Sequence, residues 1–185
     1  MVRADVEERF TAIPQGVDVA LEGKSLRVKG PLGEITRDFS HAPVEIVAAD
    51  GGVYVRSYWA RKTERALVGT VAAHVKNMIN GVTKGYTYKL KVVFSHFPVT
   101  IKVNPGKVLI ENFIGEKSPR TARIIGNAKV TVKGDDVIVQ GVNLEEVSQT
   151  AANIERATKI KKKDPRVFLD GIYIYERGEG AGGEG

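Results

Sequence analysis

The 185-residue chain contains no cysteine. This absence excludes a disulfide framework, a metal site built on thiolates and a cysteine nucleophile. It also fits a reducing compartment, where disulfides do not persist. The hydrophobic share of 42% is that of an ordinary globular protein. We therefore expect a hydrophobic core, without covalent cross-links, to hold the fold together.

Long hydrophobic runs are missing as well. The longest apolar stretches, such as residues 90–94 with Lys91 inside, fall far short of the roughly 20 residues that a membrane-spanning helix needs. The first ten residues carry charges throughout and lack the apolar segment of a secretory signal. We expect a soluble, cytoplasmic protein.

Patterns of catalytic and metal-binding residues are scarce. His41, His74 and His96 show no metal-ligand spacing, and the sequence has neither a G-x-S-x-G motif nor a distinct carboxylate pair. Residues 180–185 fit G-x-G-x-x-G literally, but they lack the strand before and the helix after that a phosphate-binding loop requires. The sequence predicts no enzyme, no catalytic residue, no metal site and no cofactor.

What the sequence does contain is a change of hydrophobic period. Between residues 17 and 55, short β-rich runs alternate with turn residues such as Gly23 and Gly51, which predicts four or five antiparallel strands. A helical period follows, and it predicts one long helix over about residues 60–82. Its apolar stripe consists of Leu67, Val71, Val75, Met78 and Val82.

The second half repeats this plan. Strand-like runs between residues 89 and 140 precede helical spacing from Leu144 to Ile154. Asn143, followed three residues later by Glu146, is typical of a capping box at a helix start. A sheet face covered by one amphipathic helix is a complete two-layer unit.

These parallels predict an α+β fold of two tandem duplicated domains, each an antiparallel β-sheet packed against one long helix. We place the N-terminal domain at residues 1–85 and the C-terminal domain at residues 86–177. The Gly-rich residues 178–185 are expected to form a disordered tail.

Positive charge is concentrated in the second half, although the net charge of the chain is only +6. Residues 86–133 contain nine Lys and Arg against two acidic residues, and residues 156–166 contain six against one, whereas residues 134–155 contain five acids and no base. Clustered cations gain affinity for a polyanion by releasing counterions from its phosphates. A solvated charged surface is the alternative, but this separation of charge favours a phosphate-binding face.

The candidate RNA-binding residues come from these two basic segments. The first contains a Gly-containing loop that brings backbone amides and guanidinium groups together, and its Phe113 either stacks on a base or packs inward. The second lies where a helix ends before Pro165. The candidates are Lys107, Asn112, Lys117, Arg120, Arg123, Lys129, Arg156, Lys159, Lys161, Lys162, Lys163 and Arg166.

Four runs of the sequence resemble a known family. They are "VKGPLGEITRDFSH" at 28–41, "HVKNMINGVTKGYTYKLKVVFSHFP" at 74–98, "IENFIGEK" at 110–117 and "KKKDPRVFLDGIYIYERG" at 161–178. In the same order, they are similar to the archaeal and eukaryotic branch of the large-ribosomal-subunit protein L-six family, whose eukaryotic member is called L-nine. The similarity covers nearly the whole chain except the Gly-rich tail.

The resemblance implies two duplicated α+β domains and a structural role in the large ribosomal subunit. It implies binding of large-subunit rRNA near the sarcin-ricin loop and the stalk base, the factor-binding region, mainly through the C-terminal domain. The contacts would lie on the "IENFIGEK" loop with the basic residues after it, and on the basic stretch before "FLDGIY". The implied partners are this rRNA, neighbouring large-subunit proteins and nearby translation factors, with no membrane and no small-molecule substrate.

A second functional class remains open. The N-terminal domain carries little net charge, and strand edges are common docking sites for other proteins. The alternative is therefore a protein-interaction module that docks a translation factor.

Overall fold

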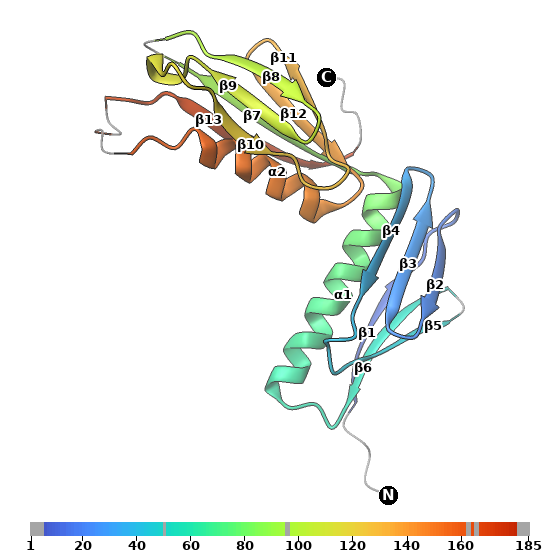
Figure 1. The fold of residues 1–185 in the computed structure, drawn as a ribbon. Coiled ribbons are helices and arrows are strands. Elements are labelled where there is room, and N and C mark those ends of the chain that lie inside the picture. Colours follow the sequence, from blue (N-terminus) through green and yellow to red (C-terminus); the bar gives the residue numbers. More distant parts are fainter. Residues whose placement is uncertain (1–5, 50, 95–96, 162–163, 165–166, 181–185) are drawn as a thin grey trace, which may run out of the picture. The chain divides into compact units, whose positions relative to one another are not determined.

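The computed structural model describes residues 6–49, 51–94, 97–161, 164 and 167–180. The chain divides into two compact units, Met1–Lys84 and Gly85–Gly185 (Figure 1). Within the described residues, none of the helices combines the length and the apolar composition needed to cross a membrane.

The first unit consists of two small antiparallel sheets and one helix. Its strands are β1 (Val6–Ala12), β2 (Asp18–Glu22), β3 (Ser25–Gly30), β4 (Gly33–Asp38), β5 (Glu45–Ala49) and β6 (Gly52–Tyr58), and its helix is α1 (Lys62–Thr83). The sheets have the strand orders β1-β6-β5 and β2-β3-β4. Helix α1 packs against strands of both sheets, so that one helix closes the core of the unit.

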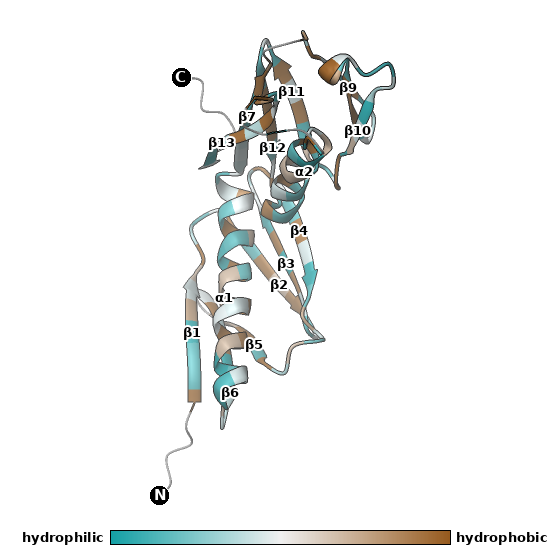
Figure 2. Cartoon of the chain, turned by 90° about the vertical axis from the view of Figure 1, so that its left-hand side faces the viewer, coloured by the Kyte–Doolittle hydropathy of each residue, from teal (hydrophilic) through white to brown (hydrophobic). Residues whose placement is uncertain are grey.

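The sequence periods account for this packing. In β6, Val53, Val55 and Ser57 alternate toward the interior and are buried. Hydrophilic and hydrophobic residues alternate along α1 (Figure 2), and its buried face includes Val71 and Val75. Burying a side chain of this size contributes roughly 1.5–3 kcal/mol. The predicted helix at residues 60–82 is confirmed with a shift of one or two residues at each end.

Within the described residues, the second unit has one more strand than the first. Its elements are β7 (Tyr86–Val93), β8 (Thr100–Asn104), β9 (Lys107–Glu111), the short 3-10 turn η1 (Phe113–Gly115), β10 (Arg120–Arg123), β11 (Lys129–Lys133), β12 (Asp136–Gly141), α2 (Leu144–Ala157) and β13 (Gly171–Glu179). The sheets have the orders β10-β9-β8 and β11-β12-β7-β13. The largest fully buried side chains of this core are Leu90, Ile110, Phe113, Ile154 and Ile172.

The strand orders reveal the duplication. The order β1-β6-β5 corresponds to β7-β12-β11, and β2-β3-β4 corresponds to β8-β9-β10, with α1 and α2 following β6 and β12. Only β13 lacks a counterpart among the described residues of the first unit. The predicted α+β class with two duplicated parts is confirmed. However, each unit divides its strands between two sheets, where the sequence predicted one.

The predicted capping box at the start of α2 is only half present. Asn143 caps α2, since its side chain accepts a hydrogen bond from the Glu145 amide at 3.0 Å. In place of the reciprocal box bond, the Glu146 carboxylate accepts a hydrogen bond from the Asn127 amide at 2.9 Å, because the turn before β11 lies against the helix start.

The predicted tail begins too early. Gly178 and Glu179 belong to β13, where they pair with Thr87 and Tyr86 of β7. Pairing with β7 provides hydrogen-bond partners for the backbone groups of these two residues, and this gain outweighs the low strand propensity of glycine. Residues 181–185 lie outside the described residues.

Candidate nucleic-acid interface

The loop at residues 112–117 has an unusual backbone. Asn112, Ile114 and Gly115 have φ values of 58°, 54° and 71°. The left-handed region is accessible to glycine and tolerable for asparagine, but it is an outlier for a β-branched isoleucine and costs about 1–3 kcal/mol. The surroundings fix this conformation, because Phe113 is buried in the core and the Asn112 side-chain amide donates to the Pro98 carbonyl at 3.0 Å. Phe113 therefore packs inward, the second of the two predicted roles.

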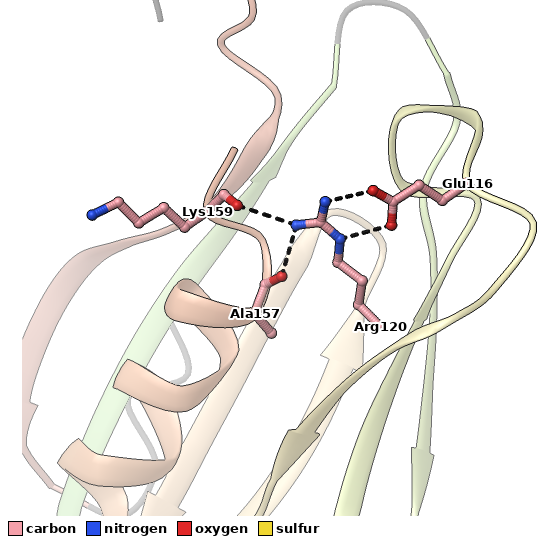
Figure 3. Close-up of polar contacts among 4 residues, drawn as sticks. All are labelled: Glu116, Arg120, Ala157 and Lys159. Carbon is pink, nitrogen blue, oxygen red and sulfur yellow. Dashed lines mark hydrogen bonds and ion pairs between the residues drawn. The ribbon is translucent and has the colours of Figure 1, made fainter. Parts of the chain in front are cut away.

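Arg120 connects this loop to the end of α2 (Figure 3). Its Nε and Nη2 donate to the two carboxylate oxygens of Glu116 at 2.8 and 2.6 Å, and its Nη1 donates to the carbonyls of Ala157 and Lys159 at 2.9 and 3.2 Å. The guanidinium also lies over the Phe113 ring, 4.4 Å from its centroid. Since a guanidinium has five N–H donors, these four hydrogen bonds leave little of it for an external ligand.

The electrostatics agree with an internal role for this pair. Hydrogen bonds from Arg120 lower the pKa of Glu116, and those same bonds to the carboxylate raise the pKa of Arg120. Carbonyls at a helix C-terminus have no partner within the helix. Arg120 supplies partners to two carbonyls there, whereas the Lys159 side chain extends away from the guanidinium (Figure 3).

A shallow groove of about 300 Å³ lies between β10 and α2. Arg123 of β10 and Arg156 of α2 line it, and both are exposed. Asn153 fixes the two elements together, because its side-chain amide donates to the Arg123 carbonyl at 3.0 Å. The structure thus brings two candidate residues, 33 positions apart in the sequence, to a single concave site.

Two polar lining residues were not among the candidates. Thr121 and Asn153 are uncharged, so a search for clustered cations does not find them. The available signal was spacing, since Asn153 precedes Arg156 by three residues and therefore lies on the same face of α2.

The remaining candidates are distributed unevenly. Lys107 lies directly opposite Arg123 in the β9–β10 ladder, so their side chains share one face of the sheet. Lys159 and Lys161 follow the end of α2 and are exposed, as are Asn112 and Lys117 in the loop. Lys129 lies in the other sheet, opposite Gln140 of β12. Lys162, Lys163 and Arg166 lie outside the described residues.

Comparison with known proteins identifies the family. A family model described as Ribosomal protein L6 matches residues 13–85 and 97–171. The chain belongs to the ribosomal protein L6 family. The resemblance stated from the sequence motifs is confirmed, and the two matched segments fall on the two duplicated units.

Members of the L6 family with archaeal sources match almost end to end. Large ribosomal subunit protein uL6 of Aeropyrum pernix is 55% identical over 89% of this chain and 91% of its own length. The proteins of the same name from Ignicoccus hospitalis and Methanobrevibacter smithii are 54% and 49% identical, over 96% of this chain and 98% and 99% of their own lengths. The L6 family is structural and not enzymatic, which confirms the prediction that the chain is no enzyme.

Ion pairs separate the cations of the C-terminal unit of this L6 family member into two groups. Lys89, Lys91 and Lys102 pair with Glu176, Asp136 and Glu111 at 3.1, 3.3 and 2.8 Å. By contrast, within the part of the chain that the structure describes, no acidic side chain pairs with a second set, which consists of Lys107, Lys117, Arg123, Lys129, Lys133, Arg156, Lys159, Lys161 and Arg177. Seven of these nine cations were candidates from the sequence, whereas Lys133 and Arg177 were not.

Metal coordination has no support in the described residues, where no cluster of three or more His, Asp or Glu side chains has a suitable arrangement. His96 lies outside them.

Proposed function

We propose that this chain, a structural constituent of the large ribosomal subunit in the cytoplasm, binds large-subunit rRNA mainly through its C-terminal unit. The observation that carries the proposal is the groove in which Arg123 and Arg156 meet without a described acidic partner. Guanidinium groups bind phosphate oxygens in a bidentate manner. Two of them on rigid, hydrogen-bonded elements fit a folded RNA backbone without reading its bases.

Arg120 has a different role in this proposal. Because its donors bind Glu116 and the two carbonyls at the end of α2, it positions the 112–117 loop and Lys159 and leaves the phosphate contacts to other residues. Arg123, Arg156, Lys107, Lys159 and Lys161 then supply the charge that displaces counterions.

We further propose that the bound rRNA lies near the sarcin-ricin loop and the stalk base, with neighbouring large-subunit proteins beside it and translation factors nearby. The support for this location is the family resemblance of the loop and of the segment before β13. Contact with a translation factor stays a prediction from the sequence.

The test compares rRNA binding of the full chain and its variants at several salt concentrations. The Arg123→Ala/Arg156→Ala double variant should bind large-subunit rRNA more weakly and lower the slope of log K against log salt by about 1.4–1.8, or about 0.7–0.9 for each lost phosphate contact. Lys102→Ala is the matched control, since Lys102 belongs to the same unit but pairs with Glu111. Equal slopes for wild type and double variant would refute binding through the groove.

The location has a separate test. A photoreactive group attached at position 156 should cross-link to rRNA near the sarcin-ricin loop in assembled large subunits. Cross-links confined to another rRNA domain would contradict the location and leave the groove as a binding site elsewhere.

A further inference from the structure

The outer edge of β1 is open in the first unit. Within the described residues, only β6 pairs with β1. Strand β7 occupies the same place in the second unit, but β12 pairs with one of its edges and β13 with the other. The duplication therefore provides an internal comparison between an open and a covered copy of one edge.

The pairing register makes the two edges equivalent residue by residue. Phe10 of β1 lies opposite Tyr54, and Lys89 of β7 lies opposite Ile138. Tyr54 and Ile138 are the central residues of the runs Val53-Tyr-Val55 and Val137-Ile-Val139, which repeat each other in the two units. Phe10 thus takes the position of Lys89, and its neighbour Thr11 takes that of Leu90.

The covered edge of β7 shows how an added strand contacts and buries the strand that it pairs with. Strand β13 runs antiparallel to β7, and Glu176 of β13 forms an ion pair with Lys89 at 3.1 Å. Under this cover Leu90 is completely buried, whereas its counterpart Thr11 is only half-buried. An uncovered edge leaves backbone N–H and C=O groups that another strand can pair with.

The face beside the open edge exposes apolar side chains. Val6 and Phe10 of β1 and Tyr58 of β6 are 40%, 53% and 50% exposed. Phe10 packs on Tyr54 with 4.8 Å between ring centroids. An exposed apolar patch of this kind is typical of an interaction site.

Charge decides between protein and RNA as the occupant. Among the described residues of this face, the cation opposite Glu8 is Arg56, and it donates to both oxygens of Glu45 at 2.9 and 3.2 Å, so it is not available to phosphate. Glu8, between Val6 and Phe10 on the same face, adds a negative charge. This surface repels an RNA backbone and attracts a strand that carries a basic residue.

We propose that an extended segment of a neighbouring protein of the large subunit pairs antiparallel with the outer edge of β1, as β13 does with β7. The residues of β1 predict the side chains of this partner segment. An apolar residue of the segment faces Phe10, at the position where Glu176 of β13 faces Lys89 of β7. A basic residue of the segment faces Glu8. Backbone pairing provides the affinity, and these alternate side chains provide the specificity.

The main experiment uses the full chain in assembled large subunits. A Phe10→p-benzoylphenylalanine variant is incorporated and irradiated, and the cross-linked product is identified by mass spectrometry. The matched control is Leu32→p-benzoylphenylalanine, which places the same probe on another exposed apolar position, in the turn between β3 and β4. Incorporation of the chain into large subunits tests the proposed function. The cross-link formed by the incorporated chain tests the docking of a partner strand on β1.

We expect position 10, and not position 32, to cross-link to one extended peptide of another protein. Hydrogen exchange of the wild type in the subunit should also slow at alternate amides of β1, the signature of a new antiparallel ladder. A link to rRNA, to this chain or to a second copy of it, a link that needs an added translation factor, or no link at all would overturn the proposal.

Charge reversal provides a second readout. Glu8→Lys in the Phe10 probe background should lower the cross-link yield by about two- to fivefold, the effect of one unfavourable cross-strand pair. Asp18→Lys, an exposed acid on β2, is the control and should leave the yield unchanged. Equal yields from both would remove the basic residue facing Glu8 from the proposal and overturn it.

Discussion

At the scale of single residues, two arginines of β10 have different roles. Arg120 and Arg123 are three positions apart in one basic segment, and charge counting treats them alike. In the structure, Arg120 binds a carboxylate and two carbonyls, while Arg123 lines an exposed groove. The sequence contained Glu116 as a hint, but the helix ending at Ala157 is 37 residues away, and such a distant partner cannot be read from local pattern.

The difference between the two arginines predicts different stabilities of their variants. Arg120→Ala removes hydrogen bonds to a carboxylate and to helix-end carbonyls, and it should lower the free energy of unfolding by about 1–3 kcal/mol. Arg123→Ala should change it by less than about 0.5 kcal/mol, because its side chain is exposed. Urea denaturation of the full-length variants measures both. Equal destabilisation would contradict the positioning role of Arg120.

Arg120→Lys is the informative intermediate. Lysine keeps the charge but cannot donate to the two Glu116 oxygens in the planar geometry of a guanidinium. We expect its stability to lie near that of Arg120→Ala. Full stability with lysine would mean that charge alone holds the loop.

Glu116 makes the stability of the same contact depend on pH. Its folded pKa is lower than its ordinary value of 4.5, because Arg120 donates hydrogen bonds to the carboxylate. The contribution is therefore fully present above pH 4.5 and is lost as the pH falls through the folded pKa. We expect the stability difference between wild type and Glu116→Gln to be constant above pH 4.5 and to shrink as the pH falls below it. A difference that stays constant as the pH falls below 4.5 would exclude an ionised Glu116 as the partner of Arg120.

At the scale of elements, the sequence predicted most helices and strands but not the division of the sheets. Period-2 and period-3.6 patterns locate β6 and α1, because each buries one face. Which strands share a sheet depends on pairing between distant segments, for which the sequence has no local signal. Strand β13 illustrates this, since its residues Gly171–Glu179 pair with β7, which lies far away in the sequence.

Helix α2 is fixed at both ends by side chains, which predicts the effect of its N-cap. Asn143 accepts the hydrogen bond of the Glu145 amide, so Asn143→Ala should lower the free energy of unfolding by about 0.5–2 kcal/mol. Asn143→Gly is the control and should cost only a few tenths of a kcal/mol, because glycine suits the extended N-cap backbone and lets water reach the free amide. Thermal denaturation of both variants measures the difference. If neither variant loses stability, the cap bond contributes nothing.

At the scale of the whole molecule, the duplicated fold was predictable because both halves repeat the same order of patterns. The candidate site was only partly predictable. Charge clusters located the C-terminal unit, yet the groove arises from Arg123 and Arg156 meeting across β10 and α2. The open edge of β1 became visible only through comparison of the two units, because its counterpart is covered by a strand that comes after α2 in the chain.

The two units share a fold but differ in charge, and this contrast leads to a prediction about the location of binding. Lys159→Ala/Lys161→Ala and Lys29→Ala/Lys76→Ala each remove two exposed positive charges, the first pair from the C-terminal unit and the second from the N-terminal unit. The net charge of the chain therefore falls by the same amount in both variants. If overall charge governed rRNA affinity, both would weaken binding equally. We expect only the first to weaken it and to lower the salt slope, by up to about 1.8 for two lost phosphate contacts. Equal slopes for the two variants, measured by filter binding of the full chain, would show that rRNA binding does not distinguish the two copies of the fold.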